Sequence, residues 1–313
     1  MKKIVSLVVA ALVMCSCADS FLSEEPVGEF MPEQVESEEN IEGIVIGAYA
    51  VLDGYYASDA INSGCSNWQF GDVVSDDAYK GGGGTGDQNQ IHLMEIFNAN
   101  PTGIDFEARW AALYEGVKRC NQAIRLLSNS TVKNKEQRLA EMRFLRGHYY
   151  FNLKVIYNLI PWIDETVVDP NEYHTKSNME FTSDQLWEKI LGEFSAAYQV
   201  LPESQSDYGR PTKMAAKAYM AKVYLYQSKW KECLSACDEV IQSGKYTLYP
   251  DFREVFLPEN DNNSEIIFAV QLSINDGASS NQNGSYGDRF FSPGGSLSNL
   301  WILAADSEFG KCL

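Results

Sequence analysis

Three long stretches of this chain repeat apolar residues at the spacing of an α-helix, and this feature constrains the fold most. Two of them cover residues 110–127 and 142–156. The third follows Asp184, which can cap a helix, and stops before Pro202. Side chains three and four positions apart share one face of a helix. Each stretch therefore predicts a helix that buries one side.

Two further helical segments predict a hairpin. Thr212 can cap an alanine-rich segment, 215–226, and a second stripe follows after a brief turn. Trp230 and Ala236 stand where tetratricopeptide units place a large and a small packing residue. With a weaker stripe over residues 41–56, the pattern predicts a mainly α fold of tetratricopeptide-like helical hairpin repeats.

The chain changes character after Gly244. Short strand-like runs at 246–249, 255–257 and 266–270 are separated by prolines and asparagine-rich turns. We therefore expect a helical domain over residues 41–245, followed by a loop-rich, partly β C-terminal region that starts over residues 246–299.

The N-terminus has the pattern of a bacterial lipoprotein signal. Residues 1–16 contain two lysines and an apolar run too short to span a bilayer. Cys17 follows the small residue Ser16, so we predict cleavage before Cys17 and lipidation of its thiol. Residues 17–40 then form an acidic tether. An ordinary secretion signal stays an alternative, because Met14 is large for a cleavage box.

Composition narrows the range of partners. The formal net charge is −18, so nucleic acid and anionic headgroups are repelled, and no nucleic acid is expected as a partner. The chain has 17 tyrosines and 6 tryptophans, and such rings favour a ligand surface that stacks on sugars. The 7 cysteines do not form a dense disulfide framework.

One irregular segment carries the candidate ligand site. Trp68 lies near Asp72, Asp76, Asp77 and Tyr79. Carboxylates accept hydrogen bonds from sugar hydroxyls while rings stack on apolar sugar faces. A solvated acidic loop anchored by one tryptophan explains the same residues equally well. Calcium binding by the aspartates is a weaker alternative, because their spacing differs from the EF-hand loop.

No motif predicts catalysis, a metal centre or a cofactor. The glycine run 81–86 lacks the Gly-Lys-Ser/Thr of a phosphate loop. Cys233 and Cys237 lie one helical turn apart with no third ligand nearby, so we interpret them as small packing residues. Catalysis would need a pair of carboxylates, and in a chain with 43 acidic residues some such pairs occur by chance.

Four stretches together resemble the SusD/RagB family of outer-membrane nutrient-binding lipoproteins of Bacteroidetes. They are residues 17–26, residues 141–151 leading to Ile160-Pro161, residues 209–213 and residues 264–268. The resemblance implies a tetratricopeptide-like scaffold without chemistry, which lies over a SusC-like TonB-dependent transporter and holds glycan or peptide for import. It also implies a surface-exposed location on the outer membrane, anchored by the N-terminal lipid.

The chain departs from this family at its end. Family members usually continue further, whereas this chain stops after an aberrant tail, residues 300–313. Under one permitted choice of codons, the nucleotides read one base later encode Pro-Thr-Gln before an apolar run, which resembles a family motif. We expect a frameshift here, and the nucleotide sequence of the gene tests it.

The sequence leaves three functions to compare. The first is a surface lipoprotein that binds a nutrient oligomer, most simply an oligosaccharide, and passes it to the transporter. The second is a lipid-anchored glycoside hydrolase, which requires one carboxyl group with a raised pKa next to another. The third is a helical-repeat scaffold that binds only protein.

Overall fold

The computed structural model describes residues 38–54, 69–75, 77–81 and 84–271, all within one unit, Ser37–Leu313. The predicted mainly α fold is confirmed, because these residues form helices and no β-strand. In chain order the α-helices are α2 (Glu38–Tyr49), α3 (Asn89–Glu95), α4 (Ile104–Asn129), α5 (Lys135–Tyr157), α6 (Pro170–Tyr173), α7 (Ser183–Val200), α8 (Lys213–Tyr226) and α9 (Trp230–Gln242). Three 3-10 helices are η3 (Ala50–Asp53), η4 (Glu254–Phe256) and η5 (Pro258–Asn260).

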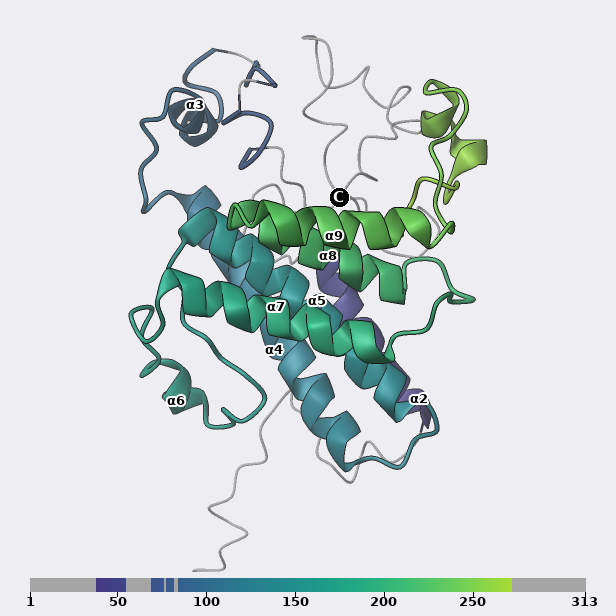
Figure 1. The fold of residues 1–313 in the computed structure, drawn as a ribbon. Helices are drawn as coiled ribbons and strands as arrows, with labels where there is room; N and C mark the ends of the chain where they lie inside the picture. Colours follow the sequence, from purple (N-terminus) through teal and green to yellow (C-terminus); the bar gives the residue numbers. More distant parts are fainter. Residues whose placement is uncertain (1–37, 55–68, 76, 82–83, 272–313) are drawn as a thin grey trace, which may run out of the picture. The chain divides into compact units, whose positions relative to one another are not determined.

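The long helices form a stack in which each packs on the next one along the chain. Helix α4 packs on α5, α5 on α7, α7 on α8, and α8 on α9, while α2 covers α4 (Figure 1). Residues 227–229 connect α8 to α9, so these two helices form the predicted hairpin. No helix in the described ranges is both long enough and apolar enough to cross a membrane.

Two glycines let neighbouring helices approach closely. A Cβ atom on Gly116 of α4 would lie 2.6 Å from the ring of Tyr149 on α5. A Cβ atom on Gly147 of α5 would lie 2.9 Å from the ring of Phe194 on α7. Such distances are far below van der Waals contact, so the large rings fit only because these positions lack a side chain.

A buried ion pair joins the centre of the stack. Arg146 of α5 is 2% exposed and donates to both oxygens of Glu193 on α7, at 2.8 and 3.1 Å. It also donates to Asn121 of α4 at 2.7 Å and contacts Glu165. Burial lowers the pKa of Arg146, but the facing carboxylates raise it further, so the net shift is upward. The guanidinium therefore stays charged in the core.

The structure corrects the predicted start of α7. Asp184 does not cap this helix; Thr182 does, because its hydroxyl accepts from the Gln185 N–H at 3.3 Å. The Gln185 side chain in turn accepts from the Thr182 N–H at 2.9 Å, which completes a capping box. The prediction that Thr212 caps α8 is confirmed by its hydrogen bond from the Ala215 N–H.

Two other expectations were wrong in the described residues. The partly β character after Gly244 is not found up to residue 271: residues 254–256 form the 3-10 helix η4, and the other runs are irregular. Trp230 is not a packing residue, since it is 64% exposed, whereas Ala236 is buried as expected. Short apolar runs fit strands and turns alike, and only their neighbours decide between the two.

Candidate functional site

The predicted ligand site lies on an exposed loop before α3. Trp68 and Asp76 fall outside the residues that the structure describes. Asp72, Asp77 and Tyr79 are described, and all three are exposed, with Tyr79 at 81%. An aromatic ring this accessible has both faces open to a planar or apolar partner.

The loop is held in place by a small apolar cluster. Val73 and Ile91 of α3 are fully buried, and Ala78 packs against them. The Ala78 N–H donates to the Asp72 carbonyl at 3.0 Å, which closes a turn. Ser75 donates to the Asp77 carboxylate at 3.1 Å. These contacts bring Asp72 and Asp77 onto one turn, with Ala78 directed inward.

Lys80 fixes the other side of the loop. Its side chain is 5% exposed, and its ammonium donates to the Gly84 carbonyl at 2.9 Å. Its backbone N–H donates to Glu95 of α3 at 3.0 Å, and this hydrogen bond is the main reason that the pKa of Glu95 is lowered. Tyr79 is therefore displayed between two anchored neighbours, Ala78 and Lys80. No sequence signal marked Lys80 as an anchor.

The loop can accept hydrogen bonds and offer a ring, which suits a polyol. In the described part of the chain, no three His, Cys, Asp or Glu side chains gather in a group that could hold a metal. Asp76, one of the aspartates of the calcium alternative, lies outside those residues.

Three of the four stretches that carry the family resemblance meet around helix α5. The ring of Phe144 contacts the ring of Phe268, with centroids 5.0 Å apart. Arg210 donates to the Glu141 carboxylate at 2.8 Å. These residues come from segments more than 50 positions apart in the sequence, so the motifs join the end of the described chain to the stack.

Glu141 is the centre of this junction. Its side chain is fully buried and accepts from Arg138 at 2.8 Å and from the Tyr49 hydroxyl at 3.0 Å. Burial first, and the Glu141 carboxylate second, raise the pKa of Tyr49. Arg210 also pairs with Glu42 of α2. Because its members bind one another, we interpret the cluster as structural.

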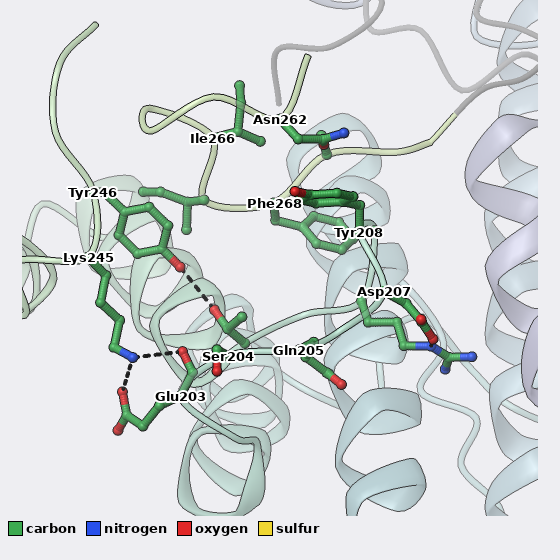
Figure 2. Close-up of a pocket in the computed structure, with 15 residues that line it drawn as sticks. Glu203, Ser204, Gln205, Asp207, Tyr208, Lys245, Tyr246, Asn262, Ile266 and Phe268 are labelled. Atoms are coloured by element: carbon green, nitrogen blue, oxygen red, sulfur yellow. Dashed lines mark hydrogen bonds and ion pairs between the residues drawn. The ribbon is translucent and has the colours of Figure 1, made fainter. Parts of the chain in front are cut away.

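A pocket of about 330 Å³ opens beside this junction (Figure 2). It lies where the α7–α8 connection meets the segment after α9. Its walls combine aromatic, amide and charged side chains, including Tyr208, Tyr246, Phe268, Asn262, Glu203 and Lys245. The volume is at the lower end of the range for ligand sites in proteins.

Most charges in the pocket are paired within it. Lys245 contacts the Glu203 carboxylate at 3.4 Å and its carbonyl at 3.0 Å, and Arg210 contacts Asp207 at 3.2 Å. Tyr208 is 73% exposed. The pocket therefore offers an open ring but little unpaired charge. Sequence reasoning missed it, although two of the family stretches line it.

Four carboxyl groups do not fit the acid that the hydrolase alternative requires. They are Glu95, Asp164, Glu165 and Glu239, and in each the pKa is lowered. Burial acts in the opposite direction, and hydrogen bonds and nearby cations outweigh it. These groups stay ionised near neutral pH.

The stacked helix pairs place the chain in the class of helical-repeat folds. A sequence model of SusD-like proteins, described as starch-binding and associating with the outer membrane, matches residues 20–225. The chain therefore belongs to the SusD-like family, as the resemblance predicted.

Known proteins of this family match most of the chain. SusD-like protein P25 of Formosa agariphila is 23% identical over 292 residues, covering 87% of this chain and 52% of P25. The structure of surface glycan-binding protein A from Bacteroides thetaiotaomicron with laminarihexaose is 29% identical with a TM-score of 0.61, covering 74% of this chain and 49% of that one. The Bacteroides fluxus protein is 28% identical with a TM-score of 0.68, covering 82% and 56%. The chain thus spans about half the length of these relatives.

Proposed function

We propose that this protein is a lipid-anchored protein of the cell surface that binds a nutrient oligosaccharide and delivers it to a SusC-like TonB-dependent transporter. One observation carries this proposal: the chain belongs to the SusD-like family, and a structural relative at 29% identity holds laminarihexaose. Laminarihexaose is a neutral glucose oligomer, which agrees with an acidic chain whose exposed loop offers acceptors and a ring.

The proposed contacts lie on the loop before α3. Tyr79 stacks on the apolar face of a sugar ring, and Asp72 and Asp77 accept hydrogen bonds from its hydroxyls. Trp68 and Asp76 complete the site in the sequence-based prediction. The anchors around the loop reduce the entropy lost on binding, because the backbone is already held.

Binding in this proposal involves no covalent step. The site holds the sugar by stacking and hydrogen bonds, and release to the transporter needs only a competing surface. Cys17 carries the acyl chains that keep the protein at the membrane. The negative net charge of the protein therefore plays no part in its attachment.

Isothermal titration calorimetry of the mature chain against laminarihexaose and a panel of other oligosaccharides tests the binding site. Two exposed tyrosines give a matched comparison: Tyr79→Ala on the loop and Tyr208→Ala in the pocket. We expect Tyr79→Ala to weaken binding about fivefold, the loss of one stacking contact, and Tyr208→Ala to leave it unchanged. The opposite ranking would move the site to the pocket.

The same samples separate the alternative functions. Oligosaccharide products in the titrated mixture, detected by anion-exchange chromatography, would favour the glycoside hydrolase. No binding to any glycan, together with recovery of a protein partner, would favour the scaffold. Co-purification with a TonB-dependent barrel from outer membranes supports delivery. Loss of membrane association in Cys17→Ala supports the anchor.

A further inference from the structure

One flank of α9 carries exposed apolar side chains in the described part of the chain. α9 packs on α8, and Ala236 and Val240 are buried, at 5% and 8% exposure. The flank beside these buried residues presents Trp230, Leu234 and Ile241, which are 64%, 62% and 70% exposed. Exposed positions of a surface helix are normally polar, so this flank has the composition of an interface.

The spacing of the exposed residues matches a coiled-coil seam. Trp230, Leu234, Cys237 and Ile241 are separated by four, three and four positions, which is the d-a-d-a order of a heptad. Cys237 is half-buried. These residues therefore form one continuous stripe along the helix.

The charges beside the stripe are also ordered. Lys231 and Asp238, both exposed, each follow a d residue, so both occupy e positions on the same edge. The g positions on the other edge are Cys233 and Val240, and Val240 is buried. Only the e edge is available to a partner helix.

We propose that this flank pairs with α9 of a second copy in an antiparallel, two-fold arrangement. When two such helices run antiparallel, e positions face e positions, so Lys231 lies opposite Asp238 of the second copy and the reverse pair forms by symmetry. In this arrangement each d residue packs against an a residue of the second copy. Trp230 therefore faces Ile241 of the second copy, and Leu234 faces its Cys237. In a parallel pair the e positions would face the apolar g edge, so the charges select the antiparallel form.

The association is weak. α9 has 13 residues, about 20 Å of helix, and one helix pair of this length covers less than the roughly 800 Å² per partner of a standard interface. The dimer therefore forms at high protein concentration and dissociates on dilution. Formation of this dimer requires neither the glycan ligand nor the transporter.

Sedimentation velocity over a concentration series of the mature chain, residues 17–313 with Cys17→Ala, tests the proposal. We expect the dimer fraction to rise with concentration. Leu234→Asp buries a charge in the seam and should leave a monomer. Ser235→Asp adds the same charge outside the seam and should dimerise normally. Far-UV circular dichroism verifies that each variant keeps its helices.

A charge exchange tests the antiparallel register. Lys231→Glu places acidic groups opposite each other and should weaken the dimer about tenfold, and Asp238→Lys should do the same with basic groups. The double variant exchanges both charges and should restore the affinity of the unmodified chain. A monomer at every concentration would overturn the proposal and leave the flank to residues 272–313 or to another protein. Failure of the double exchange to restore the dimer would overturn the pairing.

Discussion

The buried guanidinium of Arg146 allows the sharpest test of how the stack is held together. Arg146→Met keeps most of the side-chain volume and removes the charge. The Glu193 carboxylate, 8% exposed, then loses its two hydrogen bonds from α5. Its remaining cation is Arg143, at 3.7 Å and 38% exposed. A buried charge left without its partner costs about 3–5 kcal/mol, a large part of the usual stability of a domain.

Arg143→Met is the matched control, because it removes the other arginine that contacts the same carboxylate. That pair is longer and more solvated, so its loss should cost about 1 kcal/mol or less. Urea unfolding at pH 7, followed by far-UV circular dichroism, compares the free energies of unfolding of the two variants with that of the unmodified chain.

A double variant separates the stranded charge from lost packing. Arg146→Met with Glu193→Leu removes both charges, so we expect it to regain most of the stability lost in Arg146→Met. The reasoning is refuted if Arg146→Met costs no more than Arg143→Met. It also fails if the double variant is as unstable as Arg146→Met alone, because the cost would then come from packing.

Three further changes test other parts of the fold. Gly116→Ala places a Cβ atom against the ring of Tyr149 and should cost about 1–3 kcal/mol of unfolding free energy. In the control Gly192→Ala, the new Cβ meets no atom within 4 Å, and α7 should become more stable by about 0.5–1 kcal/mol. Equal effects of the two variants in thermal melts would contradict the close approach of α4 and α5. Burial lowers the pKa of His148 from 6.5 to about 3. As the pH falls, His148 therefore takes up a proton in the unfolded state before it does so in the folded state. The free energy of unfolding should fall by about 1.4 kcal/mol for each pH unit below 6.5. His148→Gln should flatten this dependence between pH 6.5 and 5 in urea titrations, and an unchanged slope would exclude His148 as its source. Thr182→Ala removes the capping hydroxyl and should cost about 1 kcal/mol of unfolding free energy, while no loss would mean that Asp184 can replace it.

Periodicity was enough to predict the long helices, because a helix that buries one face must repeat its apolar residues every three to four positions. The stripes at residues 110–127 and 142–156 became α4 and α5. The N-cap of α7 was harder to place, since both Thr182 and Asp184 are residue types that cap helices, and only the structure shows that the helix begins at Ser183 with Thr182 as its cap. The short apolar runs after Gly244 could form either strands or turns, because a few residues do not distinguish the two.

The candidate site was partly open to prediction. Tyr79 and its acidic neighbours could be selected by residue type, because rings and carboxylates are what a sugar-binding surface needs. Lys80 could not, since its role depends on a carbonyl and a helix that only the folded chain brings near. The pocket could not either, because it forms between segments separated by more than 30 residues.

Some features of this chain depend only on residues close together in the sequence, so the sequence alone predicts them. They are the helical apolar repeats, the capping Thr212 and the lipoprotein-like N-terminus. Which helix faces remain exposed is decided by contacts between distant segments. Trp230 was expected to be buried and is exposed, while Glu141 and Arg146, both charged, are buried because carboxylates and guanidinium groups from other helices meet them there. Burial of a charge depends on its partners, and those exist only in the tertiary structure.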